Sequence, residues 1–133
     1  MEQFIKTILR WSEGNENQIR NIVNLHATQD TIIALSTPFG MGAIAMIRMS
    51  GTESIAITNR FFESKFGKKD LTQVDSHSIH LGYINDGVQP IDEVLVSIFK
   101  NPNSYTGEDL VEISCHGSTY IQHSILQHFV ANG

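Results

Sequence analysis

The sequence predicts an α+β domain with a mixed, largely antiparallel five-stranded sheet and helices packed on it, in the order ββαβββα. Three observations support this class. From residue 30 on, short β-branched and apolar runs alternate with glycine turns. Asn85-Asp86-Gly87 separates two such runs, as in a β-hairpin. Two other segments space their apolar residues as helices do, and helices inserted among hairpins favour a sheet covered on one face.

Residues 1–29 differ from the rest of the chain. Their apolar residues recur at helical spacing in two groups, which are Phe4, Ile5, Ile8 and Leu9, and then Ile19, Ile22 and Val23. Asn17 is placed to cap the second group. We expect a helical or loosely ordered extension here, without chemistry of its own, and a partner-binding helix is the alternative.

The strands are predicted from runs in which apolar side chains alternate with others. They are Thr31–Ser36, Ala43–Met49, His77–Ile84, Asp92–Phe99 and Leu110–Cys115. In the second strand the alternation puts Ala45 and Ile47 on one face and Arg48 on the other. In the fifth strand it separates Ile113 from Glu112 in the same way.

Two helices complete the domain. Ser50-Gly51-Thr52 is expected to cap a helix that runs to about Phe62. After Gly117, a helix capped by Ser118 or Thr119 is expected to end at Asn132-Gly133. The polar loop 65–70, with its three lysines, is typical of a solvated helix end and receives no function.

Composition narrows the class of protein. The chain has 133 residues, about the size of one domain, with 41% hydrophobic and 17% charged residues. No apolar run is long enough for a membrane span. The formal charge of −5 disfavours direct binding of a phosphate backbone. Cys115 is the only cysteine and no secretory signal is visible, so we expect a cytoplasmic protein.

Glu112 and Arg48 are the candidate site residues. Each is a single charge within an otherwise apolar strand, and the two charges have opposite signs. A carboxylate in such a place costs desolvation unless a partner compensates it. The partner is either a protein group, which makes the two residues a structural ion pair, or a ligand.

Other motifs give no site. No Gly-x-x-x-x-Gly-Lys-Ser/Thr sequence occurs, so the chain has no P-loop. Gly40-Met-Gly42 precedes a strand, where a dinucleotide site needs a helix. His77 and His80 face opposite sides of a strand, and His123 and His128 are poorly aligned on a helix, so no metal site is expected. Cys115 shares its face with apolar residues, which is typical of an inert thiol, and no catalytic residue is assigned.

Three ordered motifs resemble the N-terminal domain of the MnmE/TrmE family of tRNA-modification GTPases. They are Asp30-Thr-Ile-Ile-Ala, then Thr37-Pro-x-Gly-x-Gly-Ala-Ile-Ala-x-Ile-Arg48-x-Ser-Gly51, and Pro102-Asn-Ser-Tyr-Thr-Gly-Glu-Asp-Leu-Val-Glu112 followed by His116-Gly117. The resemblance covers residues 30–133, which are expected to form the MnmE/TrmE-like tetrahydrofolate-binding domain.

The resemblance implies a folate-binding, homodimer-forming domain that precedes a helical domain and a G domain, neither of which this chain contains. It implies that Arg48 and Glu112 bind 5-formyltetrahydrofolate, with a further basic contact from a later segment. It also implies a flavoprotein partner similar to MnmG, modification of the wobble uridine of tRNA with one carbon from the folate, and GTP with potassium and magnesium in the absent G domain. Contact with tRNA would then be indirect.

Two functional hypotheses follow. The first is a noncatalytic folate-binding and dimerisation domain. The alternative is a purely structural assembly module, in which Arg48 and Glu112 only stabilise the sheet. A complete one-carbon transferase is disfavoured, because the chain shows no convincing general base or nucleophile.

Overall fold

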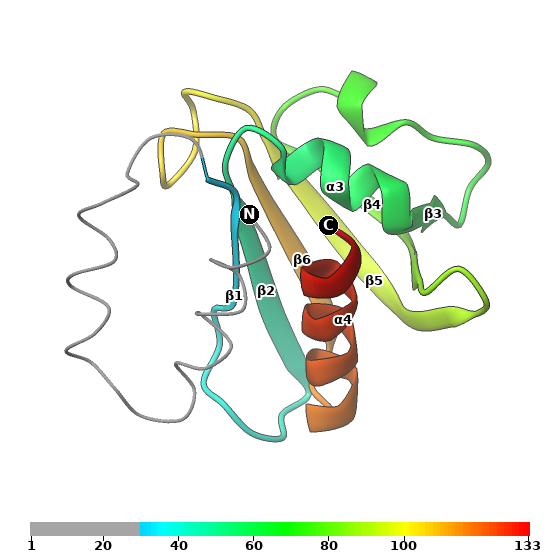
Figure 1. The fold of residues 1–133 in the computed structure, drawn as a ribbon. Coiled ribbons are helices and arrows are strands. Elements are labelled where there is room, and N and C mark those ends of the chain that lie inside the picture. The colour runs from blue at the N-terminus through cyan, green and yellow to red at the C-terminus, as the bar shows by residue number, and fades with distance from the viewer. Residues whose placement is uncertain (1–29) are drawn as a thin grey trace, which may run out of the picture.

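The computed structural model describes residues 30–133. The expected extension 1–29 lies outside the described residues. Within residues 30–133 the chain forms a six-stranded sheet with two α-helices and one short 3-10 helix, so the predicted α+β class is confirmed (Figure 1).

The predicted elements are found within a few residues of their expected ends. The strands are β1 (Ile32–Leu35), β2 (Ile44–Ser50), β3 (Phe62–Ser64), β4 (Ser78–Asn85), β5 (Pro90–Phe99) and β6 (Leu110–His116), and the helices are α3 (Ser54–Phe61), η1 (Leu71–Gln73) and α4 (Thr119–Asn132). The hairpin turn at Asn85-Asp86-Gly87 is present, and Asp86 Oδ1 accepts the backbone N–H groups of Val88 and Gln89 at 2.8 Å each.

The sixth strand, β3, was not predicted. It follows α3 without a break, and its three residues are too short to show an alternating pattern. It pairs with β4, where Ser64 lies opposite Gly82. A Cβ atom at Gly82 would lie 2.5 Å from the ring of Phe62, so the missing side chain lets this strand approach.

All strand pairs among the described residues are antiparallel, in the order β1-β2-β6-β5-β4-β3. The expectation of a largely antiparallel sheet is therefore correct, and the parallel component that a mixed sheet would have is not found among them. The last strand of the chain, β6, lies between β2 and β5. This insertion places residues 64 positions apart side by side at the centre of the sheet.

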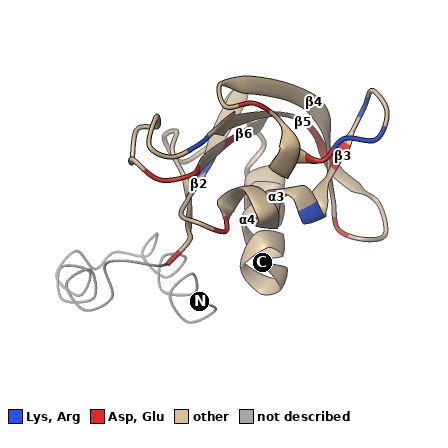
Figure 2. Cartoon of the chain, turned by 90° about the horizontal axis from the view of Figure 1, so that it is seen from above, with Lys and Arg blue, Asp and Glu red and all other residues tan. Residues whose placement is uncertain are grey.

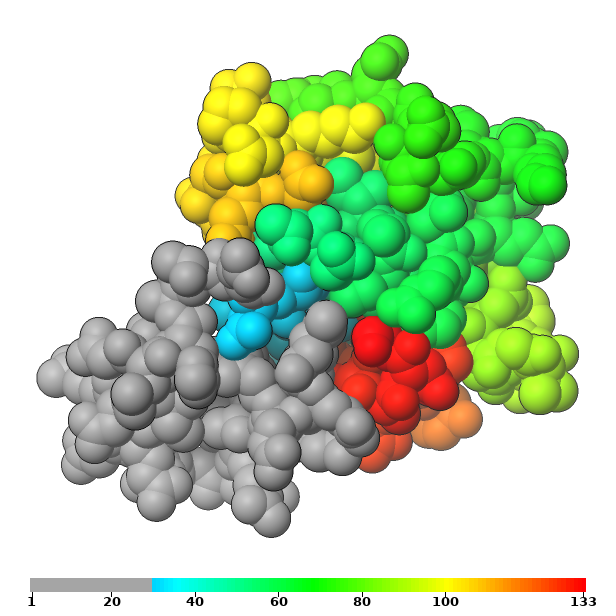
Figure 3. Space-filling view, turned by 45° about the horizontal axis from the view of Figure 1, so that its top comes forward, coloured from blue at the N-terminus to red at the C-terminus, as the bar shows by residue number. Residues whose placement is uncertain are grey.

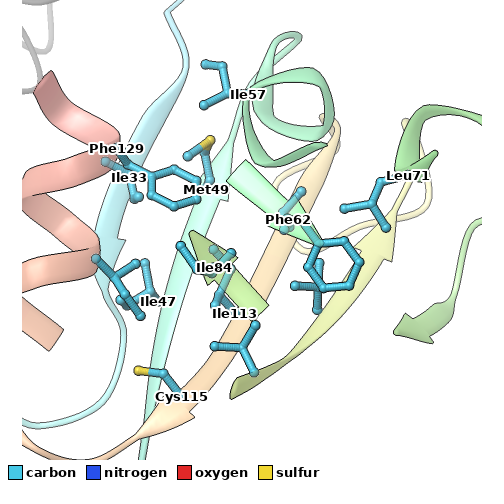
Figure 4. Close-up of a cluster of buried hydrophobic side chains, with 14 of the residues drawn as sticks. Ile33, Ile47, Met49, Ile57, Phe62, Leu71, Ile84, Ile113, Cys115 and Phe129 are labelled. Carbon is cyan, nitrogen blue, oxygen red and sulfur yellow. The ribbon is translucent and has the colours of Figure 1, made fainter. Parts of the chain in front are cut away.

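Both helices pack on the same face of the sheet (Figures 1 and 2). The core lies between the sheet and the two helices, and it contains alternate residues of the strands together with apolar residues of α3 and α4 (Figure 4). Ile47, Ile113 and Phe129 are essentially inaccessible there. Each such side chain contributes roughly 1.5–3 kcal/mol on burial, so this face stabilises the domain. The C-terminal end of α4 lies beside α3 (Figure 3).

The start of α3 differs from the prediction. No side chain of Ser50, Thr52 or the observed N-cap residue Glu53 caps this helix. The hydroxyl of buried Thr31 instead accepts the backbone N–H of Glu53 at 3.1 Å. Gly51 has a φ of 132°, which glycine adopts readily. A Cβ atom at Gly51 would lie 2.6 Å from Thr31 Cα, so only glycine lets the two segments come this close. A distant residue thus takes the place of the local cap. Ser118 is the N-cap of α4 as predicted, without a side-chain cap bond.

The other face of the sheet, called the open face below, is covered by neither α3 nor α4. Arg48, Glu112 and His116 lie on it together with exposed apolar side chains of four strands, which are Ile32, Ile44, Ile79 and Leu95. The two faces of the sheet therefore have different roles: one forms the core and the other remains available for contacts.

No helix in the part of the chain that the structure describes is long and apolar enough to cross a membrane.

The contact between Gly42 and Gly117 gives a stability test. Gly42 N–H donates to Gly117 O at 2.9 Å, and Gly117 N–H donates to Ala43 O at 3.2 Å. A Cβ atom at Gly117 would lie 2.1 Å from Gly42 O, whereas one at Gly42 would meet only Ile44 O at 3.6 Å. Gly117→Ala should lower the free energy of unfolding by about 1–3 kcal/mol or more, measured by urea denaturation. Gly42→Ala is the matched control and should change it by less than about 1 kcal/mol. Equal effects would contradict this account.

Candidate functional site

The pairing of β2 with β6 brings the two predicted site residues together. In the antiparallel register Arg48 lies directly opposite Glu112. Both side chains point to the open face, because their neighbours Ile47, Met49, Val111 and Ile113 fill the core on the other. The two isolated charges of opposite sign are therefore direct cross-strand neighbours.

The ion pair is formed and leaves several polar atoms unused. Arg48 Nε donates to Glu112 Oε1 at 2.7 Å. The side chain of Arg48 is 43% exposed and that of Glu112 is 14% exposed. Among residues 30–133, Glu112 Oε2 and both terminal nitrogens of Arg48 have no hydrogen-bond partner. A carboxylate oxygen and guanidinium donors therefore remain side by side for a ligand with both donors and acceptors.

Tyr105 and the loop 101–109 border this pair. The ring of Tyr105 is 83% exposed, and its centroid lies 5.1 Å from Arg48 Cζ. Ser50 Oγ, at the end of β2, is 2.7 Å from Thr106 Oγ1 and 3.0 Å from Glu108 Oε2. The loop is thus fastened beside β2 and holds an aromatic ring over the guanidinium. Tyr105 belongs to the motif that starts at Pro102 but was not among the predicted site residues, although an aromatic residue in a polar turn is a signal that could have found it.

Asp92 and His116 form a second polar contact, and neither residue was among the predicted site residues. Asp92 Oδ1 is 2.8 Å from His116 Nδ1, and Asp92 Oδ2 accepts the backbone N–H of His116 at 2.8 Å. The Asp92 side chain is 7% exposed and that of His116 is 69% exposed. The two residues belong to adjacent strands, β5 and β6, and only the strand order brings them together.

Cys115 lies on the core face, as predicted. It is buried, and that burial, followed by the negative charge of Asp92, raises the pKa of its thiol to about 11. The thiolate is the nucleophilic and metal-binding form, so this pKa disfavours both roles. Among the described residues there is no group of three or more His, Cys, Asp or Glu side chains that could hold a metal ion.

The loop 65–70, with its three lysines, borders a cavity whose lining does not include Arg48 or Glu112. The cavity has a volume of about 670 Å³ and is lined by Asn59, Phe62, Glu63, Ser64, Gly67, Lys68, Lys69 and Asp70. Figure 2 shows basic residues gathered at this end of the sheet, beside β3. Lys69 Nζ is 3.1 Å from His80 Nδ1. Burial and then the charge of Lys69 lower the pKa of His80. The acidic Glu63 and Asp70 in the same lining offset the lysines.

The raised pKa of Cys115 predicts slow alkylation. At pH 8 only about a thousandth of a thiol with a pKa near 11 is ionised, far less than for an ordinary cysteine. Iodoacetamide should modify the native chain at least about tenfold more slowly than the urea-unfolded chain, as followed by mass spectrometry. The unfolded chain is the control for reagent activity. Equal rates in the two states would contradict the burial of the thiol.

Comparison with known proteins agrees with the resemblance that these motifs indicate. The family model described as the N-terminus of the GTP-binding protein TrmE matches residues 31–133. The chain is similar to the tRNA modification GTPase MnmE of Flavobacterium johnsoniae, with 58% identity over 105 residues, which cover 79% of this chain and 22% of that protein. The MnmE proteins of Flavobacterium psychrophilum and Bacteroides thetaiotaomicron are 57% and 49% identical over 104 and 105 residues, which cover 78% and 79% of this chain.

The chain spans about a fifth of the length of these relatives, since the matched region covers 22% of each. The match takes in every described strand and helix, and both residues of the ion pair lie within it. The chain therefore belongs to the family of TrmE N-terminal domains, found at the N-terminus of tRNA modification GTPases.

Proposed function

We propose that this domain binds a reduced folate of the 5-formyltetrahydrofolate type and forms a homodimer, as part of a GTPase that modifies the wobble uridine of tRNA. The observation on which the folate proposal rests is the Arg48–Glu112 pair, with its unused carboxylate oxygen and guanidinium nitrogens on the open face. The family membership supports the tRNA-modification context.

The chemistry of the two side chains fits a pterin. A pterin presents an amino group and a ring N–H side by side, and Glu112 has one oxygen that accepts no bond from residues 30–133. Charge-assisted hydrogen bonds of this kind contribute roughly 1.5–3 kcal/mol each. The terminal nitrogens of Arg48 supply donors for a pterin or formyl oxygen. In the bound state the folate would supply one carbon for the tRNA modification.

A purely structural role for the pair is the alternative. It is favoured by the direct contact at 2.7 Å, because each charge already has a partner. However, an ion pair with one partner 43% exposed contributes only about 0.2–1 kcal/mol. Such a small gain does not account for a charged pair at the centre of a sheet, and ligand binding supplies a further reason for it.

Dimerisation is supported by the apolar side chains of the open face. Ile79 is 67% exposed and Leu95 is 45% exposed, and both lie on strands whose opposite face is buried. Exposed apolar groups that gather on one surface are typical of an interface. We propose that a second copy of the chain covers part of this face.

The remaining parts of the proposed system lie outside this chain. The relatives are named GTPases and are several times longer than the matched region, while this chain has no P-loop. GTP, with potassium and magnesium, would therefore bind to a separate G domain. A flavoprotein similar to MnmG is proposed as the partner of the full-length protein, with tRNA contacted indirectly. A cytoplasmic location stays a prediction.

Glu112→Ala tests the folate site. Titration calorimetry with 5-formyltetrahydrofolate should show binding to the wild-type chain, and the substitution should weaken it about tenfold or more because the carboxylate acceptor is lost. Glu93→Ala is the matched control: it breaks the ion pair with Lys65 elsewhere in the sheet and should leave the affinity unchanged.

The same titration should be repeated with the matched region of the Flavobacterium johnsoniae relative replaced by residues 31–133, so that later segments are present. If neither protein releases heat that Glu112→Ala removes, the folate proposal is wrong. A large drop in melting temperature for Glu112→Ala under those conditions would support the structural alternative.

Charge substitutions on the open face test the dimer. The wild-type chain should sediment as a dimer at micromolar concentrations. Ile79→Lys and Leu95→Lys should each shift it toward the monomer, because they place a charge within the apolar contact. Val88→Lys is the control, since Val88 is 92% exposed in the β4–β5 turn. A monomeric wild type, or dimers insensitive to both strand substitutions, would contradict the proposal.

A further inference from the structure

The hydrogen bonds of His80 determine which nitrogen of its ring carries the proton. His80 lies on β4 and is 8% exposed. Ser78 Oγ is 2.8 Å from His80 Nε2, and it donates its single proton to Asp75 O at 2.6 Å. The hydroxyl can therefore only accept a hydrogen bond from the ring, so Nε2 is protonated and Nδ1 carries a lone pair. Lys69 Nζ, 3.1 Å from Nδ1, donates to that lone pair.

The contact between Lys69 and His80 holds a segment of loop 65–70 that has few other bonds. No hydrogen bond joins the backbone of residues 67–69 to any of the residues that the structure describes. Backbone bonds from Lys65 and Leu71 fix the chain on either side of this segment. A segment without backbone hydrogen bonds has low local stability. The ammonium of Lys69 is therefore the group that fastens it to the sheet.

The same segment forms part of the cavity beside β3. Residues 67–69 all belong to its lining. Glu63 and Asp70, the two acids of the lining, accept hydrogen bonds from other residues and form none with Lys69. Among the described residues, His80 is thus the hydrogen-bond partner of the Lys69 ammonium. A loss of this bond would free one side of the cavity.

We propose that His80 is a pH-sensitive switch for loop 65–70: the neutral ring holds Lys69 against the sheet, and the protonated ring releases it and opens the cavity. When Nδ1 gains a proton, an N–H group and an ammonium face each other, and both are positively charged. His80 is buried and bonded to Ser78, whereas Lys69 is exposed. The lysine is therefore the partner that moves away.

The surroundings of the ring decide where the switch operates. Burial, and then the positive charge of Lys69, hold the pKa of His80 below its ordinary value of 6.5. On β5 the residue opposite His80 is the uncharged Val96, and Asp75 faces the ring through Ser78 with its carbonyl group. No acidic side chain among the described residues contributes to the shift. Loop 65–70 is therefore held above the lowered pKa and released as the pH falls through it.

Substitution of single lysines tests the electrostatic link. Long-range ¹H–¹⁵N NMR of the full chain should show the neutral His80 ring protonated at Nε2, and a titration gives its pKa. Lys69→Ala should raise this pKa because it removes a positive charge beside the ring, while burial keeps it below the ordinary value. Lys68→Ala is the matched control, since it removes the neighbouring lysine of the same lining and should leave the pKa unchanged. A neutral ring protonated at Nδ1, or equal shifts from both substitutions, would overturn the inference.

The motion of the loop tests the switch itself. The ¹H–¹⁵N heteronuclear NOE of the Gly67 and Lys68 amides should be high while His80 is neutral, and it should fall with the midpoint of the His80 titration. His80→Gln should abolish that midpoint, because an amide does not titrate there. Lys69→Ala should give the low value on both sides of it. This variant keeps the test valid even where His80→Gln is destabilised, because Lys69 is exposed.

Two outcomes of the motion experiment contradict the switch. They are loop motion that does not follow the His80 titration, and the same midpoint in His80→Gln. Either would leave the proposed function intact, because His80 points away from the open face: its neighbour Ile79 is 67% exposed there, and successive side chains of a strand alternate between faces.

Discussion

The register between β2 and β6 is the constraint on which the rest of the structure depends. Because side chains alternate along a strand, a slip of β2 by one residue would place Arg48 in the core and Ile47 outside it. A slip of β6 would do the same with Glu112 and Ile113. The apolar residues of both strands therefore fix the register through their burial. The ion pair follows from that register without needing to stabilise it.

One face of the sheet stabilises the fold, and the other face is available for binding. The face under α3 and α4 holds a continuous apolar core (Figure 4), and its single cysteine has the raised pKa of an inert thiol. The open face holds Glu112 Oε2 and the terminal nitrogens of Arg48, which lack partners within the described residues, together with exposed apolar side chains. A ligand or a second protein copy on the open face would leave the core unchanged. For this reason substitutions of its charged residues can test binding without unfolding the domain.

Several features of the site depend on contacts between distant parts of the chain. Thr31 caps α3 across 22 residues, and Asp92 orients His116 across 24. In the same way Ser50 fastens the loop that carries Tyr105. Each of these residues is polar and stands where polar residues are common, near a turn, a helix start or the end of a strand. Local patterns therefore gave no reason to pair them, whereas the isolated charges Arg48 and Glu112 stood out against apolar neighbours.

The sequence by itself determined the fold class, most element positions, the faces of the strands, the hairpin turn and the two charges that belong together. These follow from local physics: side-chain periodicity, turn residues and the cost of a lone charge among apolar neighbours. Only the tertiary structure decided that β6 inserts between β2 and β5, that β3 adds a sixth strand, and that Asp92 lies against His116. Strand order depends on which apolar faces pack together across the whole chain, and no short window of sequence contains that information.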